Sequence, residues 1–598
     1  MTDVLSVFNE SIAICENEYR KCQRVFSWLS YLRVALVLAA LVLFVFFANA
    51  RDIQSIVLLL VLFPLLFGWL VSRHNKVKYS RDQAGFMIKI NKDEIDRFHH
   101  KLDHVATGQQ YMDTNHPYSA DLDIFGQHSL FSLLNRTTTA AGSDRLAEWL
   151  TKRAERDTIV RRQEAVAELK ALKDWRHRFQ ATGMHFQNQQ SNINILNTWL
   201  AEKGQKQNVL LMLASFILPM VTLFALGAWL LGMAAAWMPG ILLAVNIALV
   251  AKSNKSVHHT MESTYEGTKA LKAYYQLIGQ IENTDFQARD LKRITTYFNS
   301  ESFKASRALR KLYFLLDYLN ARANAFYHVL NMVFLLDFHL TRALEKWKTQ
   351  NGEKVAHWFS LLGEMEAYNS LAGYAFNRQE ASFPEISEES YVLRCKNMGH
   401  PLLPGHSRVN NDFELQGKGR VMIVTGSNMS GKSTFQRTVG VNCVLAFLGA
   451  PVCADAMTVS VMQVFTSMRV SDKLEENVSS FYAELKRIRA LLDLTQSSGV
   501  PVLYMLDEVL KGTNSHDRHT GAMALVKQLS REKAMGLVST HDLELGELSK
   551  ELATVTNGSF NSSMEGEKLV FNYKLHEGIC QSFNASQLMK QMGIKIDE

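Results

Sequence analysis

The chain has 598 residues, enough for about three or four structural units rather than one. Its six cysteines are scattered, with no C-x-x-C pair and no histidine cluster, which argues against a disulfide framework and against a zinc site. The formal net charge of +7 is modest for this length, so charge alone does not indicate a nucleic-acid-binding protein.

Three long charge-free apolar runs lie in the first half of the chain, at residues 34–50, 53–72 and 207–251. About 20 helical residues cross a hydrocarbon core of about 30 Å, because each residue advances about 1.5 Å. The first two runs therefore predict a hairpin of two short spans, and the third predicts a second hairpin. Buried core helices are the alternative, but such helices rarely lack charges over so long a run. Polar residues precede the first run, which excludes a cleaved signal peptide.

Basic residues near the ends of these runs predict their orientation. The flanking cations are Arg20, Lys21, Arg24 and Arg33, then Arg73, Lys76, Lys78 and Arg81, then Lys203 and Lys206, and finally Lys252 and Lys255. Because cations favour the cytoplasmic side, only the short turns near residues 49–52 and 237–240 are expected outside. The sequence thus predicts a multi-pass protein of the inner, cytoplasmic membrane with four transmembrane helices and its large polar parts in the cytoplasm.

Residues 253–368 contain almost no glycine or proline and are expected to be helical. Apolar residues recur there at spacings of three and four, as at Leu309, Leu312, Leu315, Leu316 and Leu319, which predicts long amphipathic helices. The same region carries a basic group that consists of Lys304, Arg307, Arg310 and Lys311. This group is either a solvated helix face or a nucleic-acid-binding surface.

Residues 425–434, TGSNMSGKST, follow the apolar segment 421–424 and open a helix-compatible stretch. This is the context that a phosphate-binding P-loop requires. Two glycines let the backbone turn so that its N–H groups face the phosphates, Lys432 reaches the outer phosphates, and Ser433 offers a hydroxyl to Mg²⁺. The predicted nucleotide-binding residues are Gly426, Ser427, Asn428, Met429, Ser430, Gly431, Lys432, Ser433 and Thr434.

Two further apolar segments end in residues suited to hydrolysis. Residues 502–506 lead to Asp507, a carboxylate for Mg²⁺, and to Glu508, a carboxylate that can polarise the attacking water. Residues 536–538 lead to His541, which is expected beside the terminal phosphate. Glu508 and His541 are ordinary surface residues in the alternative interpretation, but the complete ordered set favours a hydrolase of nucleoside triphosphates.

Together these motifs resemble the ATPase domain of MutS-type proteins, the DNA mismatch-repair clamps and their relatives. The pair Asn428–Met429 is specific to that group among P-loop proteins. Residues 121–143 and 161–166 resemble the start of the MutS helical core, and residues 576–586 resemble the segment that closes the ATPase domain. The resemblance implies ATP and Mg²⁺ as cofactors, a homodimer with composite ATP sites, and DNA as a partner.

The resemblance also implies roles for two further residues, and it shows where this sequence differs from the family pattern. It implies that Ser479 contacts the nucleotide of the neighbouring subunit, a role compatible with capping a helix. Arg408 stands where the family stacks an aromatic ring on adenine, so either its guanidinium stacks there or base selectivity is lost. Leu510 and Lys511 replace the family's Gly-Arg. No mismatch-reading module precedes the core, so mismatch reading is not expected.

The predicted fold is an α/β P-loop NTPase domain of the ABC/MutS type joined to an all-α core and lever domain, with two transmembrane helical hairpins. The predicted units are an N-terminal helix at 1–33, hairpin 1 at 34–72, a linker helix at 73–118, the first part of the core at 119–206, hairpin 2 at 207–251, the helical lever at 252–383 and the ATPase domain at 384–598.

These expectations combine into a membrane-anchored, dimeric, DNA-binding ATPase. Two other classes stay open. One is a nucleotide-driven membrane scaffold or signalling switch that never touches DNA. The other is an ABC-type transporter, which is weakened by the lack of a Leu-Ser-Gly-Gly-Gln signature and by the small number of spans.

Overall fold

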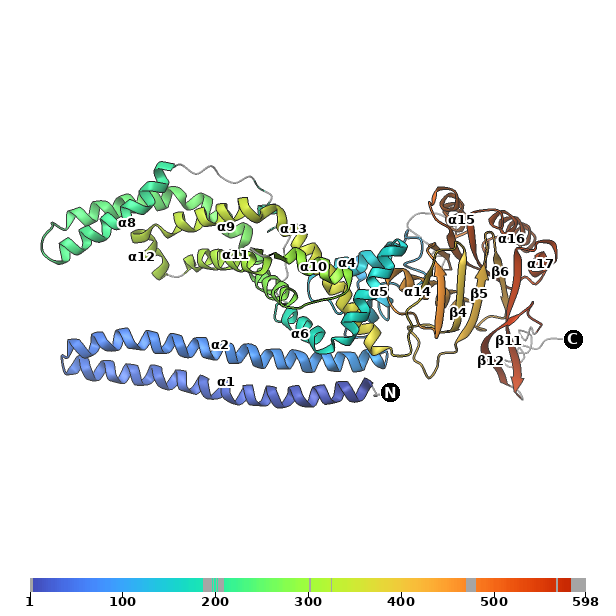
Figure 1. Ribbon diagram of the computed structural model, residues 1–598, viewed down its shortest axis with the longest axis horizontal. Coiled ribbons are helices and arrows are strands. Elements are labelled where there is room, and N and C mark those ends of the chain that lie inside the picture. The colour runs from blue at the N-terminus through green and yellow to red at the C-terminus, as the bar shows by residue number, and fades with distance from the viewer. Residues whose placement is uncertain are drawn as a thin grey trace.

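The computed structural model describes residues 4–186, 196, 198–200, 202, 209–300, 303–323, 325–468, 480–565 and 568–581. Ser479, Lys203, Lys206 and residues 582–586 of the closing motif lie outside the described residues. The molecule is elongated, with helices along most of its length and β-sheets at one end (Figure 1).

The first two helices form a long antiparallel hairpin. They are α1 (Val4–Asn49) and α2 (Ile53–Phe98), which contact each other along their length. Asp52 caps α2, because its side chain accepts a hydrogen bond from the Ser55 backbone N–H at 3.2 Å. Each helix contains an apolar run and a polar part. Helix α1 continues without a break through residue 33, where a unit boundary was predicted, and α2 does so through residue 72.

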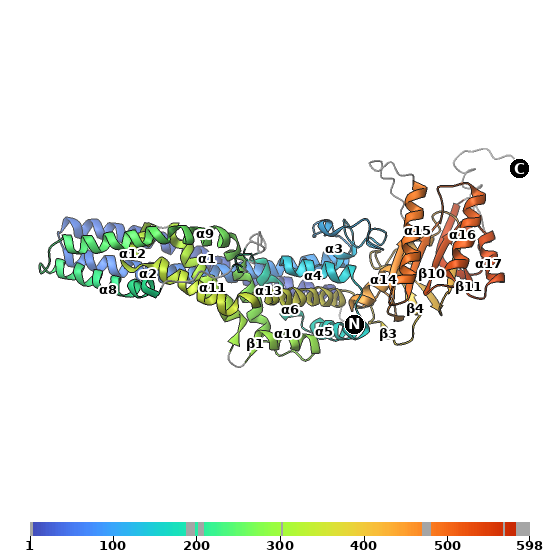
Figure 2. The ribbon, with the colours of Figure 1, turned by 90° about the horizontal axis from the view of Figure 1, so that it is seen from above.

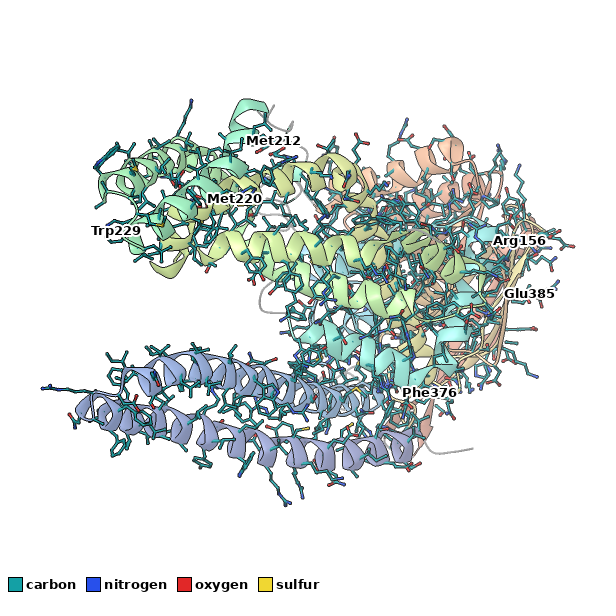
Figure 3. The ribbon with its side chains drawn as sticks, turned by 60° about the vertical axis from the view of Figure 1, so that its left-hand side comes forward. Arg156, Met212, Met220, Trp229, Phe376 and Glu385 are labelled. Atoms are coloured by element: carbon teal, nitrogen blue, oxygen red, sulfur yellow. The ribbon has the colours of Figure 1, made fainter. Side chains whose placement is uncertain are left out.

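A second hairpin consists of α8 (Val209–Leu230) and α9 (Trp237–Glu282). Three helical segments are long and apolar enough to cross a membrane, namely α1, α2 and residues 212–230. A fourth results if residues 237–252 and 257–265 of α9, which are bent by 51°, form one span. Figures 1 and 2 show the turns of both hairpins at the end of the molecule opposite the sheets. Figure 3 shows Met220 and Trp229 of α8 there, and both side chains are exposed.

The helical middle of the molecule packs around α13 (Leu336–Asn377), whose large side chains Trp347, Trp358 and Tyr368 are buried. The other helices are α3 (Leu130–Leu134), α4 (Ala140–Thr151), α5 (Arg156–Ala171), α6 (Lys173–Met184), α10 (Arg289–Phe298), α11 (Ala305–Asn320) and α12 (Ala325–Phe334). A short hairpin of β1 (Asn299–Ser300) and β2 (Phe303–Lys304) lies between α10 and α11. Of the five leucines that predicted the amphipathic helix, four are buried on α11, and Leu315 is half-buried.

The C-terminal part contains two sheets. The four-stranded sheet has the order β3 (Glu385–Ser387), β7 (Ala456–Ser460), β4 (Val392–Met398), β5 (Asn411–Gln416). The six-stranded sheet has the order β12 (Lys568–Glu577), β11 (Val555–Glu565), β6 (Val421–Gly426), β10 (Ala534–Thr540), β9 (Val502–Asp507), β8 (Gln463–Ser467). The helices there are α14 (Lys432–Leu448), α15 (Ser480–Ser497), α16 (Ser515–Leu529) and α17 (Leu548–Glu551).

Strands β6, β10, β9 and β8 run parallel to one another. Their carboxyl ends therefore meet at one edge of the sheet, which is where ligands bind in open α/β sheets. The predicted P-loop follows β6, the predicted carboxylates end β9, and the predicted histidine follows β10. The structure therefore contains the α/β domain and the helical arm of the predicted fold class.

Candidate active site

The loop between β6 and α14 has the backbone that its glycines predict. Gly426 and Gly431 have φ values of 155° and 107°. A Cβ atom at Gly426 would lie 2.7 Å from the Phe560 carbonyl oxygen, so only glycine fits there. No side chain caps the N-terminus of α14, which leaves its first N–H groups available to an anion.

The polar side chains of this loop fit a phosphate-bearing ligand. The Lys432 ammonium donates to the carbonyl oxygens of Gly426 and Ser427 at 2.8 and 2.9 Å, and burial lowers its pKa. The hydroxyls of Ser427 and Ser430 are buried and have no hydrogen-bond partner among the described residues. A buried hydroxyl without a partner is costly, and phosphate oxygens would accept hydrogen bonds from both.

Ser433 and Asp507, the predicted Mg²⁺ ligands, lie in direct contact. The Ser433 hydroxyl donates to Asp507 Oδ2 at 2.6 Å, and Ser539 at the end of β10 donates to Asp507 Oδ1. Hydroxyl and carboxylate oxygens form the donor set that Mg²⁺ prefers. Ser433 and Asp507 could therefore hold this ion, with Ser539 fixing the carboxylate.

The predicted base, Glu508, lies between a histidine and a lysine. Its Oε1 atom is 2.8 Å from His541 Nε2, and its Oε2 atom is 3.0 Å from Lys511 Nζ. His541 Nε2 also lies 2.8 Å from the amide oxygen of Asn428 in the P-loop. The contacts with His541 and Lys511 lower the pKa of Glu508 to about 2. The sequence motifs predicted Glu508 and His541 at this site, but they did not predict the contact between Glu508 and Lys511.

Tyr573 of β12 is a candidate that the sequence analysis missed. Its ring lies 3.1 Å from where a Cβ atom at Gly431 would be, and 44 % of the residue is exposed. Asn411 fixes this part of β12, since its amide donates to the Tyr573 carbonyl and accepts from the Leu575 N–H. An exposed aromatic ring beside a P-loop can stack on a base.

Arg408, the residue predicted to stack on adenine, makes different contacts. Its Nε donates to Asn410 Oδ1 at 3.1 Å, and its side chain packs against Gly399. Burial, followed by the charges of Arg378 and Arg408, lowers the pKa of His100 to about 3. Among the described residues, Arg408 forms no hydrogen bond or ion pair with residues 426–434. Its stacking role stays a prediction.

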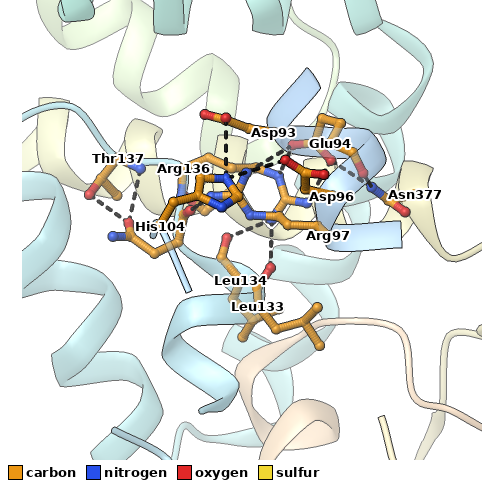
Figure 4. Close-up of polar contacts among 12 residues, drawn as sticks. Asp93, Glu94, Asp96, Arg97, His104, Leu133, Leu134, Arg136, Thr137 and Asn377 are labelled. Carbon is orange, nitrogen blue, oxygen red and sulfur yellow. Dashed lines mark hydrogen bonds and ion pairs between the residues drawn. The ribbon is translucent and has the colours of Figure 1, made fainter. Parts of the chain in front are cut away.

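A buried polar cluster joins α2, the start of the core and the end of α13; we call it the joint (Figure 4). Arg136 donates two hydrogen bonds to Glu94, from Nε at 2.6 Å and from Nη2 at 2.8 Å, and Asn377 donates a third at 2.8 Å. Arg97 donates to the Asn135 carbonyl at 2.8 Å. Burial alone would raise the pKa of Glu94, but Arg136 holds it at about 2.

Glu366 of α13 fixes the next residues of the core. Its carboxylate accepts hydrogen bonds from the backbone N–H and the hydroxyl of both Thr138 and Thr139. Thr139 in turn caps α4. Burial raises the pKa of Glu366. The segment that resembles the MutS core is thus held to α13 by buried carboxylates.

Comparison with known proteins supports the resemblance that the motifs indicated. Residues 422–594 match the family model described as MutS domain V. The DNA mismatch repair protein MutS of Thermotoga sp. (strain RQ2) is 32% identical over 237 residues, which cover 39% of this chain and 29% of that protein.

Two other MutS relatives match a similar share of the chain at similar identity. The MutS protein of Finegoldia magna is 29% identical over 253 residues, covering 41% of this chain and 29% of the relative. That of Aquifex pyrophilus is 30% identical over 263 residues, covering 43% and 30%. The chain spans under a third of the length of each of these relatives. The C-terminal part of the chain, residues 422–594, is thus similar to domain V of the MutS family, and the chain is related to DNA mismatch repair proteins MutS.

Proposed function

We propose that this protein is a membrane-anchored, Mg²⁺-dependent ATPase that works as a homodimer and binds DNA with its helical arm. One observation carries the proposal: Lys432, the Ser433–Asp507 pair and the Glu508–His541 pair gather at the carboxyl ends of β6, β9 and β10. These are the groups needed to bind, neutralise and hydrolyse a triphosphate.

Each group has a distinct chemical task. The loop N–H groups and Lys432 would bind the phosphates, while Ser433 and Asp507 would hold Mg²⁺, whose charge stabilises the phosphoryl group as it transfers. Glu508 would accept a proton from the attacking water. His541 would hold Glu508 in place and contact the terminal phosphate from the same side as Asn428. Tyr573 is the described aromatic residue best placed to stack on the base.

The contacts of Glu508 suggest why a second subunit would matter. A carboxylate whose pKa is about 2 is a weak base. Its basicity increases when Lys511 or His541 moves away from it. In the proposed dimer, ATP brings the ATPase domains together, and the segment that contains Ser479 reaches the partner's nucleotide. That approach would rearrange the residues around Glu508 and permit turnover.

The variant Glu508→Gln tests the catalytic assignment. The amide keeps the size of the side chain but accepts a proton poorly, so ATP should bind and turnover should fall by roughly 10²- to 10⁴-fold. Glu547→Gln is a matched control, because Glu547 is an exposed carboxylate in the same domain. Unchanged turnover in Glu508→Gln would remove Glu508 from the mechanism.

Membrane anchoring rests on the apolar hairpins. Their turns lie at one end of the molecule, and large apolar side chains such as Leu60, Phe224 and Leu231 are exposed there. Burying such surface in lipid is favourable by about 25 cal/mol per Å². We place the protein in the inner, cytoplasmic membrane as a multi-pass protein with the ATPase domain in the cytoplasm.

An impermeant thiol reagent applied to whole cells tests this topology. Ala50→Cys and Met233→Cys place a thiol in the two hairpin turns, and Lys418→Cys places one in the ATPase domain. The first two should react in intact cells and the third only after permeabilisation. Protein without an introduced cysteine measures the background from Cys22, which is half-buried. Labelling of Lys418→Cys in intact cells would reverse the proposed orientation.

DNA binding is proposed from the name of the relatives and from a basic pocket on the arm. Lys304, Arg307 and Lys311 from β2 and α11 face Lys354 of α13 across a pocket of about 820 Å³. None of these four cations forms an ion pair with another described residue. Unpaired cations around a concave surface favour a polyanion.

A binding comparison separates this function from its alternatives. Duplex, mismatched, branched and single-stranded DNA are titrated against the detergent-solubilised protein with and without ATP, at several salt concentrations. Salt-dependent binding that is equal for matched and mismatched duplexes supports a DNA-binding ATPase that does not read mismatches. If no DNA binds above background, the membrane switch or scaffold replaces it. ATPase stimulation by a solute in liposomes would favour a transporter.

A further inference from the structure

Helix α12 exposes several large apolar side chains together with His328, and it buries the polar side chains of Tyr327 and Asn331. Val329 and Leu330 are 61% and 49% exposed, and Met332 and Phe334 are exposed as well. On the opposite face, Asn331 is 1% exposed and Tyr327 is 8% exposed. A helix on a water-facing surface has the reverse pattern. The exposed face, centred on Val329, is therefore suited to an apolar medium.

The buried face of α12 is held by a network around Asp337 at the start of α13. Asp337 accepts hydrogen bonds from the Tyr327 hydroxyl at 2.7 Å and from the Asn331 amide at 2.8 Å. The Asn331 side-chain oxygen accepts the Asp337 backbone N–H at 3.0 Å. Leu335, with φ of 52°, separates α12 from α13. The network fixes α12 at the end of the arm and leaves its apolar face outward.

The place of α12 in the molecule indicates which apolar medium it meets. It contacts α8 and α9, the helices of the second apolar hairpin (Figure 1). Just before α12, Arg322 donates to Asn254 at 2.9 Å, and Asn254 lies three residues after the apolar run of α9. Just after α12, His339 Nε2 lies 3.1 Å from the Ser215 carbonyl, in the first turns of α8. Helix α12 thus begins and ends near the end of that hairpin that is away from its turn.

The length of α12 limits how it can meet a bilayer. Its residues 325–334 extend about 15 Å, half of the roughly 30 Å hydrocarbon thickness, so it cannot span. Helices with one apolar face and a position at the headgroup boundary lie in the membrane plane. We infer that α12 is an in-plane membrane helix whose Val329 face lies in the lipid interface.

This inference rests on the membrane part of the proposed function and goes beyond it. The hairpins anchor the chain, whereas α12 ends the arm formed by α11 and α13 and would bring that arm into contact with lipid. Movement of α13 would then change the position of α12 in the lipid interface.

Quenching by brominated lipids tests the inference on the full-length protein in phosphatidylcholine–phosphatidylglycerol liposomes. A polarity-sensitive NBD fluorophore is attached at Val329→Cys or at Met332→Cys, a second reporter on the same face. Phe224→Cys, 79% exposed on α8, reports the hairpin, and Tyr297→Cys, 45% exposed on α10, reports the arm away from the apolar helices. All variants carry Cys22→Ser. Bromines are placed either shallow or deep in the acyl chains.

Strong quenching at residues 329 and 332 by shallow bromines, comparable to that at residue 224 by deep bromines, is the expected result, with no quenching at 297. Quenching at 224 with water-like, unquenched emission at 329 and 332 would overturn the inference while the proposed anchoring stands. Apolar but unquenched emission at 329 and 332 would show that a second copy covers this face and would also overturn it. No quenching at 224 would instead refute the membrane anchoring.

Discussion

Replacing Glu94 by glutamine should open the joint between α2 and α13. Glu94 is 2% exposed, and Arg136 donates two hydrogen bonds to it. One pKa unit corresponds to about 1.4 kcal/mol, so the depression from 4.5 to about 2 corresponds to roughly 3 kcal/mol of local stability. Removing one partner of a buried ion pair costs about 3–5 kcal/mol, which is consistent with this value.

The same pKa predicts how the joint responds to acid. A carboxylate whose pKa is lowered by folding stabilises the folded state above its ordinary pKa of 4.5. That stabilisation is lost as the pH falls toward about 2, because Glu94 then takes up a proton. In the wild-type protein, the joint should therefore open between these two pH values. The glutamine variant should lack this transition, since it cannot ionise.

Hydrogen exchange of the backbone amides in the last turns of α2 measures this opening directly. A loss of roughly 3 kcal/mol corresponds to a fall in protection on the order of 100-fold. Glu164→Gln is the matched control, because Arg289 donates two hydrogen bonds to Glu164 in the same geometry, at 2.9 and 2.8 Å, but in an exposed pair. Exposed pairs contribute little. Equal protection in the two variants would refute the assigned role of burial.

Three further predictions concern the ATP site and the arm. Lys511→Met removes one of the groups that lower the pKa of Glu508, so the acid limb of the pH–kcat profile should move to higher pH; an unmoved limb would exclude this contact from the working enzyme. Ser433→Ala should increase the Mg²⁺ concentration needed for half-maximal turnover by about 10- to 100-fold, whereas Ser549→Ala, outside the site, should not. Arg307→Glu should weaken DNA binding at low salt and reduce the slope of log Kd against log salt by about 1 or more, while Arg153→Glu, an exposed charge outside the pocket, should change neither.

Sequence patterns located the parts of the site that depend on local chemistry. A P-loop needs its glycines, lysine and serine at fixed spacings after a strand, so residues 426–434 could be assigned before the fold was known. Asp507, Glu508 and His541 follow apolar segments that form β9 and β10, and parallel pairing brings these strand ends together. Residues such as Tyr573 gave no such signal. It reaches the P-loop because β12 pairs with β11 and β11 pairs with β6.

Long-range pairs explain the other omissions. Glu94, Arg136 and Asn377 lie in three separate segments, and their spacing in the chain has no local periodicity that could predict a contact. The outward apolar face of helix α12 could not be predicted from the sequence for a different reason. A short apolar stretch within a helical arm has the same composition whether it packs inside or faces outward, and only its three-dimensional environment, with Val329 exposed and Asn331 buried, separates the two. The distribution of charges in residues 1–98 predicts where the apolar runs begin and end. It does not predict helix ends, because α1 and α2 each continue from the apolar run into the polar part without interruption.

Hydrogen bonds join the core to β8 of the ATPase domain and, at the joint, to α2 and α13. Asp121 of the core accepts hydrogen bonds from the Thr466 hydroxyl at 2.8 Å and the Met468 N–H at 3.1 Å, at the end of β8. Met468 directly precedes the segment that carries Ser479, so movement of that segment on dimer closure would pull on the core. Within the core, Arg136 holds Glu94 of α2, and Asn377 holds the same carboxylate from α13.

Both routes from the joint toward the apolar end are single helices. Helix α2 runs from Glu94 back to the first hairpin turn at Ile53, and α13 runs from Asn377 back to Leu336, beside α12. A helix transmits a displacement along its axis because its hydrogen bonds would have to break for it to shorten. A closure at the ATP site would then move the first hairpin and α12 together only while Glu94 links the two helices. Glu94→Gln should therefore keep ATP turnover, and the distance between labels on α2 and α12, which ATP should leave unchanged in the wild-type protein, should change on ATP binding in the variant.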